Sequence, residues 1–263
     1  MISELINNAH KLSQASKLLG NRNKKAVANN VRGVILFDGV SELTGERIVA
    51  IATIESNNVK TGNMVQTWII RSDVSPVEAS KQHKDDAICG NCPHRQNTGG
   101  ACYVNIGQAP SSVYRAYKKG SYRPFDESAH KELFFGRMIR LGSYGDPAAV
   151  PVEVWNNILK YCIGHTGYTH QINHKNFQKD ILKICQVSAD TPKQALKLQK
   201  QGLKTFRVAL PNDGLLEDEI ECLSDSKGLS CLACGLCDGS KQNIAIVVHG
   251  VRSNRFKSKL ITQ

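Results

Sequence analysis

The stretch RMIRLGSYGDPAAVPVEVWNNILKY, residues 137–161, contains a predicted strand, a turn and a predicted helix in succession. Arg137 to Leu141 has the composition of a short, mostly buried strand. Gly142 to Pro147 forms a glycine-rich turn. Val152 to Tyr161 repeats apolar residues at helical spacing. A strand that leads into a helix is one β/α unit, and repeated units of this size predict a parallel sheet with helices outside it.

More such elements surround this stretch. A helix is predicted at Pro110 to Lys119, and Thr191-Pro192 begins another that Gly202 ends. The further predicted strands are Tyr168–Ile172, Ile184–Ser188, Thr205–Leu210 and Ile244–Val248. Residues 75–250 are therefore predicted to form one cysteine-rich α/β domain, built as an open sheet or as an incomplete barrel.

The first 74 residues follow a different pattern. Ile2 to Leu19 has the apolar spacing of an amphipathic helix, and Gly20 ends it. The runs VRGVILF, ERIVAIATIE and MVQTWIIRS are separated by turn-forming residues and predict a small antiparallel meander. Ser75-Pro76-Val77-Glu78 is a capping box that begins a helix. The predicted organisation is a basic helix and β-meander (1–74), the α/β domain (75–250) and a basic C-terminal tail (251–263).

Positive charge is concentrated at the two ends of the chain. The formal net charge is +11; residues 1–37 contribute +5 and residues 239–263 another +5, so the 201 residues between them are almost neutral. Flexible basic ends suit an anionic polymer, because phosphate contacts by Lys and Arg are additive. We therefore expect DNA or RNA as a partner; solvated termini that maintain solubility are the alternative. The candidate phosphate contacts are Lys24, Lys25, Arg252, Arg255, Lys257 and Lys259.

Hydropathy argues against a membrane protein. The longest apolar run, Ile48 to Ile54, is far shorter than the roughly 20 residues of a membrane helix. The N-terminus also has no basic, apolar and small-residue succession of a signal peptide. We expect a cytoplasmic protein.

Nine cysteines are the strongest compositional signal, and seven of them form two groups. The odd count and the absence of a secretion signal disfavour a disulfide framework, so metal or cluster binding is the better interpretation. Cys162 and Cys185 have apolar neighbours and are predicted to be inert buried thiols. The first group is Cys89, Cys92 and Cys102; the second is Cys222, Cys231, Cys234 and Cys237.

The two groups favour different sites. Three cysteines need a fourth ligand such as His94 to close a zinc site, or they bind a [4Fe-4S] cluster that leaves one iron open. Four thiolates in a tight CxxCxxC tract favour a second cubane cluster, with structural zinc as the alternative. Neither alternative is excluded by the spacing.

Polar residues follow several predicted strands. Gly145, Asp146 and Pro147 follow the first, and His170 with Gln171, Ser188 with Asp190, Arg207, and His249 accompany later ones. The carboxyl ends of parallel strands meet at one edge of a sheet, where ligands bind in α/β folds. A site is therefore expected at that edge, although each residue alone also fits an ordinary turn.

These motifs occur in a recognisable order. A cysteine group that ends in Cys102-Tyr103 is followed by RLGSYGDPAAVP, TGYTHQ, a serine-containing strand, TFRV and a CxxCGLC segment. Over roughly residues 85–250, the chain resembles the radical S-adenosylmethionine superfamily, and more specifically its divergent members from phages and mobile elements.

The resemblance implies a partial (β/α) barrel of radical-SAM type and a [4Fe-4S] cluster on Cys89, Cys92 and Cys102. It also implies S-adenosylmethionine beside Gly145, Asp146 and Pro147, with Ser188 and Arg207 for its ribose and carboxylate. The implied chemistry is reductive cleavage of S-adenosylmethionine and hydrogen abstraction from a nucleic acid or nucleotide. Two features depart from the superfamily: nine residues precede the last cysteine of the first group, and Asp146 stands where Glu is usual.

Two other functions remain open at this stage. One is a non-catalytic, metal-stabilised nucleic-acid-binding protein of the replication type. The other is a base-exchanging transglycosylase with structural zinc at the second cysteine group and Asp146 as nucleophile; it leaves the first cysteine group unexplained.

Overall fold

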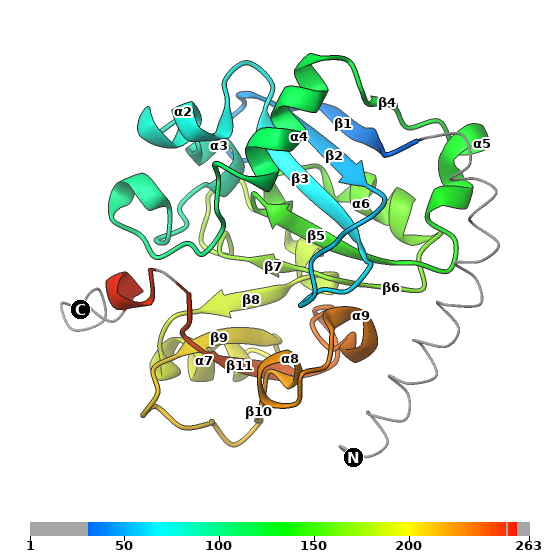
Figure 1. Ribbon diagram of the computed structural model, residues 1–263. Coiled ribbons are helices and arrows are strands. Elements are labelled where there is room, and N and C mark those ends of the chain that lie inside the picture. The colour runs from blue at the N-terminus through cyan, green and yellow to red at the C-terminus, as the bar shows by residue number, and fades with distance from the viewer. Residues whose placement is uncertain (1–30, 251, 257–263) are drawn as a thin grey trace.

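The computed structural model describes residues 31–250 and 252–256, and Figure 1 shows their arrangement. The predicted helix from Ile2 to Leu19 and the basic residues Lys24, Lys25, Lys257 and Lys259 lie outside these residues. The described chain is a mixed α/β fold with two sheets, in which most neighbouring strands are parallel.

The first sheet has six strands in the order β4-β1-β2-β3-β5-β6. Strands β1, β2 and β3 are antiparallel neighbours, which confirms the predicted meander. Strand β4 pairs in parallel with β1, and β5 pairs in parallel with β3 and β6. The strands are β1 (Gly33–Val40), β2 (Arg47–Thr53), β3 (Val65–Arg71), β4 (Arg123–Pro124), β5 (Met138–Tyr144) and β6 (Gly164–Thr166).

The second sheet has five strands, all parallel, in the order β10-β11-β9-β8-β7. Its strands are β7 (Tyr168–Thr169), β8 (Gln186–Ala189), β9 (Thr205–Ala209), β10 (Glu219–Glu221) and β11 (Asn243–Val247). Four of the predicted strands are thereby confirmed, β7 with an earlier end. Strand β10 is short and was not predicted.

Gly167 lies between β6 and β7, where one sheet passes into the next. Its N–H donates to the carbonyl of Cys237 at 2.9 Å. A Cβ at this position would lie 2.6 Å from the sulfur of Cys185, so only glycine fits. Among the described residues, the strands do not close into a barrel.

The helices connect the strands and cover the sheets. Side chains of Ser75 and Thr191 cap α2 and α7 by accepting from Glu78 N and Gln194 N, as the sequence predicts. The α-helices are α2 (Pro76–Lys81), α3 (Asp86–Cys89), α4 (Ala109–Lys118), α5 (Glu127–His130), α6 (Val152–Leu159), α7 (Pro192–Gln199), α8 (Leu223–Ser226) and α9 (Cys231–Cys234). Short 3₁₀ turns are η1 (Gln96–Thr98), η2 (Lys131–Leu133), η3 (Pro147–Ala149) and η4 (Lys179–Lys183).

The main core surrounds the central strand β2. Ile48 to Ala52 are fully buried because β2 has neighbours on both edges and packed residues on both faces. This explains the apolar run without invoking a membrane. Helices α2 to α9 include none that is long and apolar enough to cross a bilayer, which holds for the described part of the chain.

Candidate functional site

The three cysteines of the first group are brought together by one folded loop. Cys89 ends α3, Cys92 N donates to Cys89 O at 3.0 Å, and Cys102 N donates to His94 O at 2.9 Å. Burial raises the pKa of the Cys89 thiol, and the nearby Cys92 and Cys102 thiols raise it further. The three sulfur atoms therefore lie within electrostatic reach of one another.

Gln171 fastens this loop to the end of β7. Its amide Nε2 donates to Cys89 O at 2.8 Å, and its Oε1 accepts from Asn91 N at 3.0 Å. Between them, Gly90 has φ +48°, and a Cβ there would lie 2.2 Å from Gln171 Oε1. Glycine is required at this point of the loop, both for the backbone angle and for the close approach.

Asp146 links the ends of β5 and β7, which belong to different sheets. It is 7% exposed, its Oδ1 accepts from Ala148 N at 3.0 Å, and its Oδ2 accepts from His170 N at 2.8 Å. Burial raises the pKa of its carboxyl, although these bonds oppose the effect. Both carboxylate oxygens are engaged within the protein, which suits an anchor of the turn better than a transglycosylase nucleophile.

Gly145 and Pro147 complete this turn beside the first cysteine group. A Cβ at Gly145, where φ is +83°, would lie 2.7 Å from Ile69 Cβ, and Pro147 begins η3. The Asp146 N–H donates to Ile88 O at 2.7 Å, one residue before Cys89. The structure thus joins the predicted Gly-Asp-Pro segment to the cysteine loop.

Ser188 and Arg207 lie on opposite faces of the second sheet. Arg207 is in register with Ala189, which packs against Ala195 of α7, so it points to the helix-covered face and Ser188 to the other. The guanidinium is 0% exposed and binds Glu219 Oε2 at 2.6 Å. This pairing satisfies Arg207 internally, and the predicted partnership of Ser188 and Arg207 on one ligand does not match their placement.

Three side chains that the sequence placed in separate motifs converge beside the first cysteine group. They are His94 from the cysteine loop, His170 directly after β7, and Asp190 directly after β8. In residues 31–250 and 252–256, they form the one trio of His, Cys, Asp or Glu whose ligand atoms all lie within 4.8 Å of one another. The available signal was that His170 and Asp190 each follow a strand; their convergence with His94 required the fold.

Charge coupling inside this trio is strong. Burial alone would lower the pKa of His170, but the Cys92 thiol and the Asp190 carboxylate raise it well above its usual value. Burial alone would raise the pKa of Asp190, but the two imidazoles hold it well below its usual range.

The second cysteine group gathers around α9. Cys222 precedes α8, Cys231 and Cys234 bound α9, and Cys237 is buried. Burial raises the pKa of the Cys234 thiol to about 11. A hydrogen bond from the backbone N–H of Leu236 opposes this rise, and the nearby thiols of Cys231 and Cys222 add to it. The β2–β3 connection covers the group: Lys60 O accepts from Cys231 N at 2.9 Å (Figure 1). Four thiols are therefore close together under a tied loop.

Arg140 and two tyrosines lie between the two cysteine groups. Arg140 Nη2 donates to the hydroxyl of Tyr103 at 2.7 Å, next to Cys102, and its guanidinium lies 5.6 Å from the ring centre of Tyr168. The Tyr168 hydroxyl donates to the Cys237 thiol. A continuous chain of contacts therefore joins the two groups, with a cation at its centre.

The C-terminal segment packs on the first cysteine loop. Arg252 Nη1 donates to Cys102 O at 3.2 Å, and the buried ring of Phe256 lies 5.4 Å from that of His94. Arg255 is exposed on the same turn. The described part of the predicted basic tail thus lies beside the candidate site.

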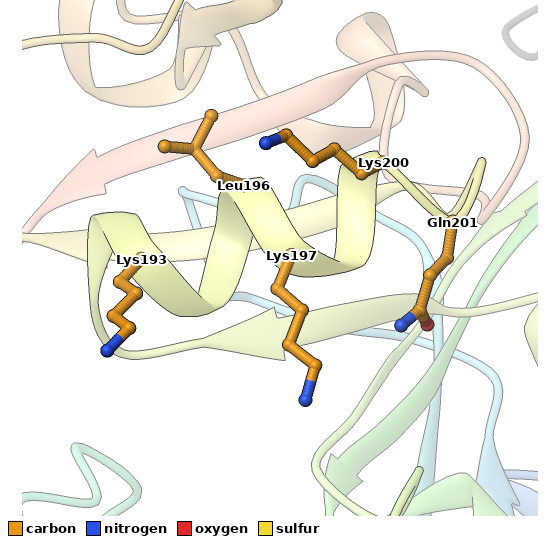
Figure 2. Close-up of a pocket in the computed structure, with 5 residues that line it drawn as sticks. All are labelled: Lys193, Leu196, Lys197, Lys200 and Gln201. Atoms are coloured by element: carbon orange, nitrogen blue, oxygen red, sulfur yellow. The ribbon is translucent and has the colours of Figure 1, made fainter.

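A second basic surface lies on α7. Figure 2 shows Lys193 and Lys197 projecting to the same side of this helix, and an open hollow there is also lined by Leu196, Lys200 and Gln201. These lysines belong to α7, which packs against β8 and β9 of the second sheet.

The spacing of the sulfur atoms distinguishes two kinds of metal site. A single zinc ion with Zn–S bonds of about 2.3 Å would hold tetrahedral thiolates about 3.8 Å apart. Among the described residues, no three cysteines have all their sulfur atoms within 4.8 Å of one another. A cubane cluster bonds each thiolate to a different iron and spaces the sulfur atoms more widely than one ion does.

No protein-family model, curated protein or solved structure matches the chain.

Proposed function

We propose that this chain is a cytoplasmic iron-sulfur protein of radical S-adenosylmethionine type, with its two sheets forming a partial barrel, that acts on nucleic acid or a nucleotide. Cys89, Cys92 and Cys102 would hold a [4Fe-4S] cluster with one iron free of cysteine. The observation that carries the proposal is the position of this three-cysteine loop over the carboxyl ends of parallel strands.

The chemistry of the donor set supports the cluster. Three thiols lie within electrostatic reach of one another on a loop that is held by backbone hydrogen bonds. When bound, such a cluster supplies an electron for reductive cleavage of a sulfonium cofactor.

The chain's own residues would position and shield that centre. Gln171 fixes the carbonyl of Cys89, and Asp146 fixes the backbone of His170. Phe256, which is 2% exposed, covers His94 and keeps water from that side of the loop. These contacts would leave the cysteine loop rigid, as a site that excludes solvent requires.

Basic residues beside the loop support a phosphate-bearing substrate. Arg252 and Arg255 lie on the segment that packs on the cysteine loop, and Lys60 and Arg140 act electrostatically on Cys231 of the second group. Positive charge beside a site attracts phosphate and orients the polymer that carries it.

The cluster is tested by anaerobic reconstitution of the full chain, followed by iron and sulfide analysis. We expect about four iron and four sulfide per first site. Cys89→Ser, Cys92→Ser and Cys102→Ser should each reduce this content, whereas Cys162→Ser, the same change outside both groups, should not. Stoichiometric zinc without sulfide in the native protein would overturn the proposal.

The nucleic-acid partner is tested by the salt dependence of binding. Replacing Arg255, Lys257 and Lys259 by Gln leaves the Arg252 contact to the loop intact. The slope of log affinity against log salt should flatten by up to roughly 3 units on duplex DNA and about 2 on single strands. An unchanged slope would show that these residues make no phosphate contacts.

A metal-stabilised nucleic-acid-binding protein without catalysis is the second candidate. The lysine face of α7, including Lys193 and Lys197, favours it, because this helix presents positive charge and contains no cysteine of either group (Figure 2). Under this alternative, Lys193→Gln with Lys197→Gln would weaken DNA or RNA binding, and the reconstituted protein would leave S-adenosylmethionine uncleaved.

A further inference from the structure

We infer that His94, His170 and Asp190 form a separate binding site for one divalent first-row transition-metal ion, with an all-nitrogen and oxygen donor set. The site adjoins the first cysteine group but uses none of its thiols. Its three ligand atoms are distinct from the proposed cluster thiolates, although His170 also contacts the Cys92 thiol.

The distances within the trio fit ligands of a common ion. His94 Nε2 lies 2.8 Å from Asp190 Oδ1, and His170 Nε2 lies 3.8 Å from the same oxygen. An ion bonded at about 2.0–2.2 Å spaces tetrahedral ligand atoms about 3.3–3.6 Å apart. The two observed separations lie on either side of that range, so small side-chain rotations bring all three atoms to it.

A hydrogen bond explains the His94–Asp190 contact but not the contact between His170 and Asp190. The separation of 3.8 Å is too long for a hydrogen bond. His170 Nε2 is nevertheless buried, without a hydrogen-bond partner, and directed at the carboxylate. An unsatisfied buried polar atom costs roughly 1–3 kcal/mol. A bound ion would remove that cost by accepting the Nε2 lone pair.

The backbone around the ligands is fixed by further contacts. His170 N donates to Asp146 Oδ2 at 2.8 Å, and Asp190 N donates to Gln194 Oε1 at 2.9 Å. The His94 ring contacts the rings of Phe256 and His170, with centroid separations of 5.4 and 5.5 Å. Contacts of this kind orient metal ligands before the ion binds.

The donor set limits the ion. Two imidazoles and one carboxylate are typical of zinc, iron(II) and similar transition metals, whereas calcium and magnesium prefer oxygen ligands. Three protein ligands leave at least one coordination position for water or a substrate group. The site would thus hold an ion that can bind an anionic substrate group beside the cysteine loop.

Cobalt(II) is a suitable probe, because its spectrum distinguishes nitrogen and oxygen ligands from thiolates. The test adds cobalt(II) anaerobically to the full chain with its cysteine sites already reconstituted. We expect the difference spectrum before and after one equivalent to show d–d bands without new thiolate charge transfer, and X-ray absorption at the cobalt edge to show a first shell of nitrogen and oxygen only.

Asp190→Asn and His170→Gln should weaken cobalt binding roughly tenfold or more. Asp180→Asn and His174→Gln, matched changes outside the trio, should leave it unchanged. Wild-type affinity in Asp190→Asn, or sulfur in the first shell of the wild-type protein, would overturn the inference; the spectroscopic result decides even if a variant does not fold. Iron and sulfide should persist in Asp190→Asn and fall in Cys89→Ser, so failure of this site and failure of the cluster are distinguishable.

Discussion

Asp146 and His170 are joined by a hydrogen bond of 2.8 Å between the carboxylate Oδ2 and the backbone N–H, across 24 positions of sequence. Because Asp146 follows β5 and His170 follows β7, this bond links the two sheets at the edge where the cysteine loop is attached. It fixes where β7 ends and the backbone position from which the His170 imidazole projects.

Asp146→Ala should therefore reduce both stability and metal binding. It leaves the buried N–H groups of Ala148 and His170 without acceptors, at roughly 1–3 kcal/mol for each unsatisfied donor. Urea unfolding measures the loss, and cobalt affinity measures the displacement of His170. Asp180→Ala, which removes an exposed carboxylate paired with the exposed Lys183, serves as the control. A transglycosylase nucleophile at Asp146 would instead predict lost activity with unchanged stability.

Gly90→Ala should disturb the first cysteine loop through one close contact. The new Cβ would lie 2.2 Å from Gln171 Oε1, whereas a Cβ at Gly99, with similarly positive φ of +75°, meets nothing within 4 Å. Gly99 is in the left-handed helical region, where Ala costs about 1–2 kcal/mol, whereas Gly90 has ψ −127° and lies outside that region, so Gly90→Ala adds both further backbone strain and the clash. Iron retention after anaerobic reconstitution should fall in Gly90→Ala alone. Equal retention would show that Gln171 does not hold the loop.

Cys234→Ala should lower the free energy of unfolding more than the loss of an ordinary buried thiol would. Its thiol belongs to a closed group of four, and loss of a metal site falls in the range above about 4 kcal/mol. Cys162→Ala removes a thiol outside both groups and should cost about 1 kcal/mol. Thermal unfolding and metal analysis of both variants test this. A folded Cys234→Ala protein with unchanged metal content would contradict a structural role for the second group.

Glu219→Gln should be strongly destabilising because the buried, positively charged guanidinium of Arg207 loses its carboxylate partner. Both side chains are 0% exposed, and removing one partner of such a pair costs roughly 3–5 kcal/mol. The double variant Arg207→Met, Glu219→Leu should recover most of that loss. Urea unfolding of both variants makes the comparison. If Glu219→Gln is neutral, Arg207 has other sufficient partners and remains available to a ligand.

His165 should make stability fall in mild acid. Burial lowers the pKa of its imidazole, although contact with Asp238 opposes the effect. Below about pH 6.5 the unfolded chain binds a proton that the folded chain does not bind. Stability is therefore full above that pH and is lost as the pH falls toward the lower folded pKa, by up to about 1.4 kcal/mol per pH unit. His165→Gln should flatten this slope in urea unfolding between pH 7 and 5, and an unchanged slope would assign the effect elsewhere.

Local sequence patterns determined most of the elements. Apolar runs predicted β1, β2 and β3, and the caps at Ser75 and Thr191 predicted the first residues of α2 and α7. These signals are readable because strand alternation and helix capping depend on residues a few positions apart. The two groups of cysteines were likewise evident from their spacing alone.

The tertiary structure alone decided which distant residues meet. β7 ends at Thr169, earlier than the apolar pattern of Tyr168 to Ile172 indicated, because the next N–H bonds to Asp146 rather than to a strand. Ser188 and Arg207 were separated onto opposite faces by the strand register, whereas His94 and Asp190, 96 positions apart, were brought into contact. Such placements arise from sheet order and loop packing, which balance burial and hydrogen bonding over the whole chain and leave no signature in any short stretch of sequence.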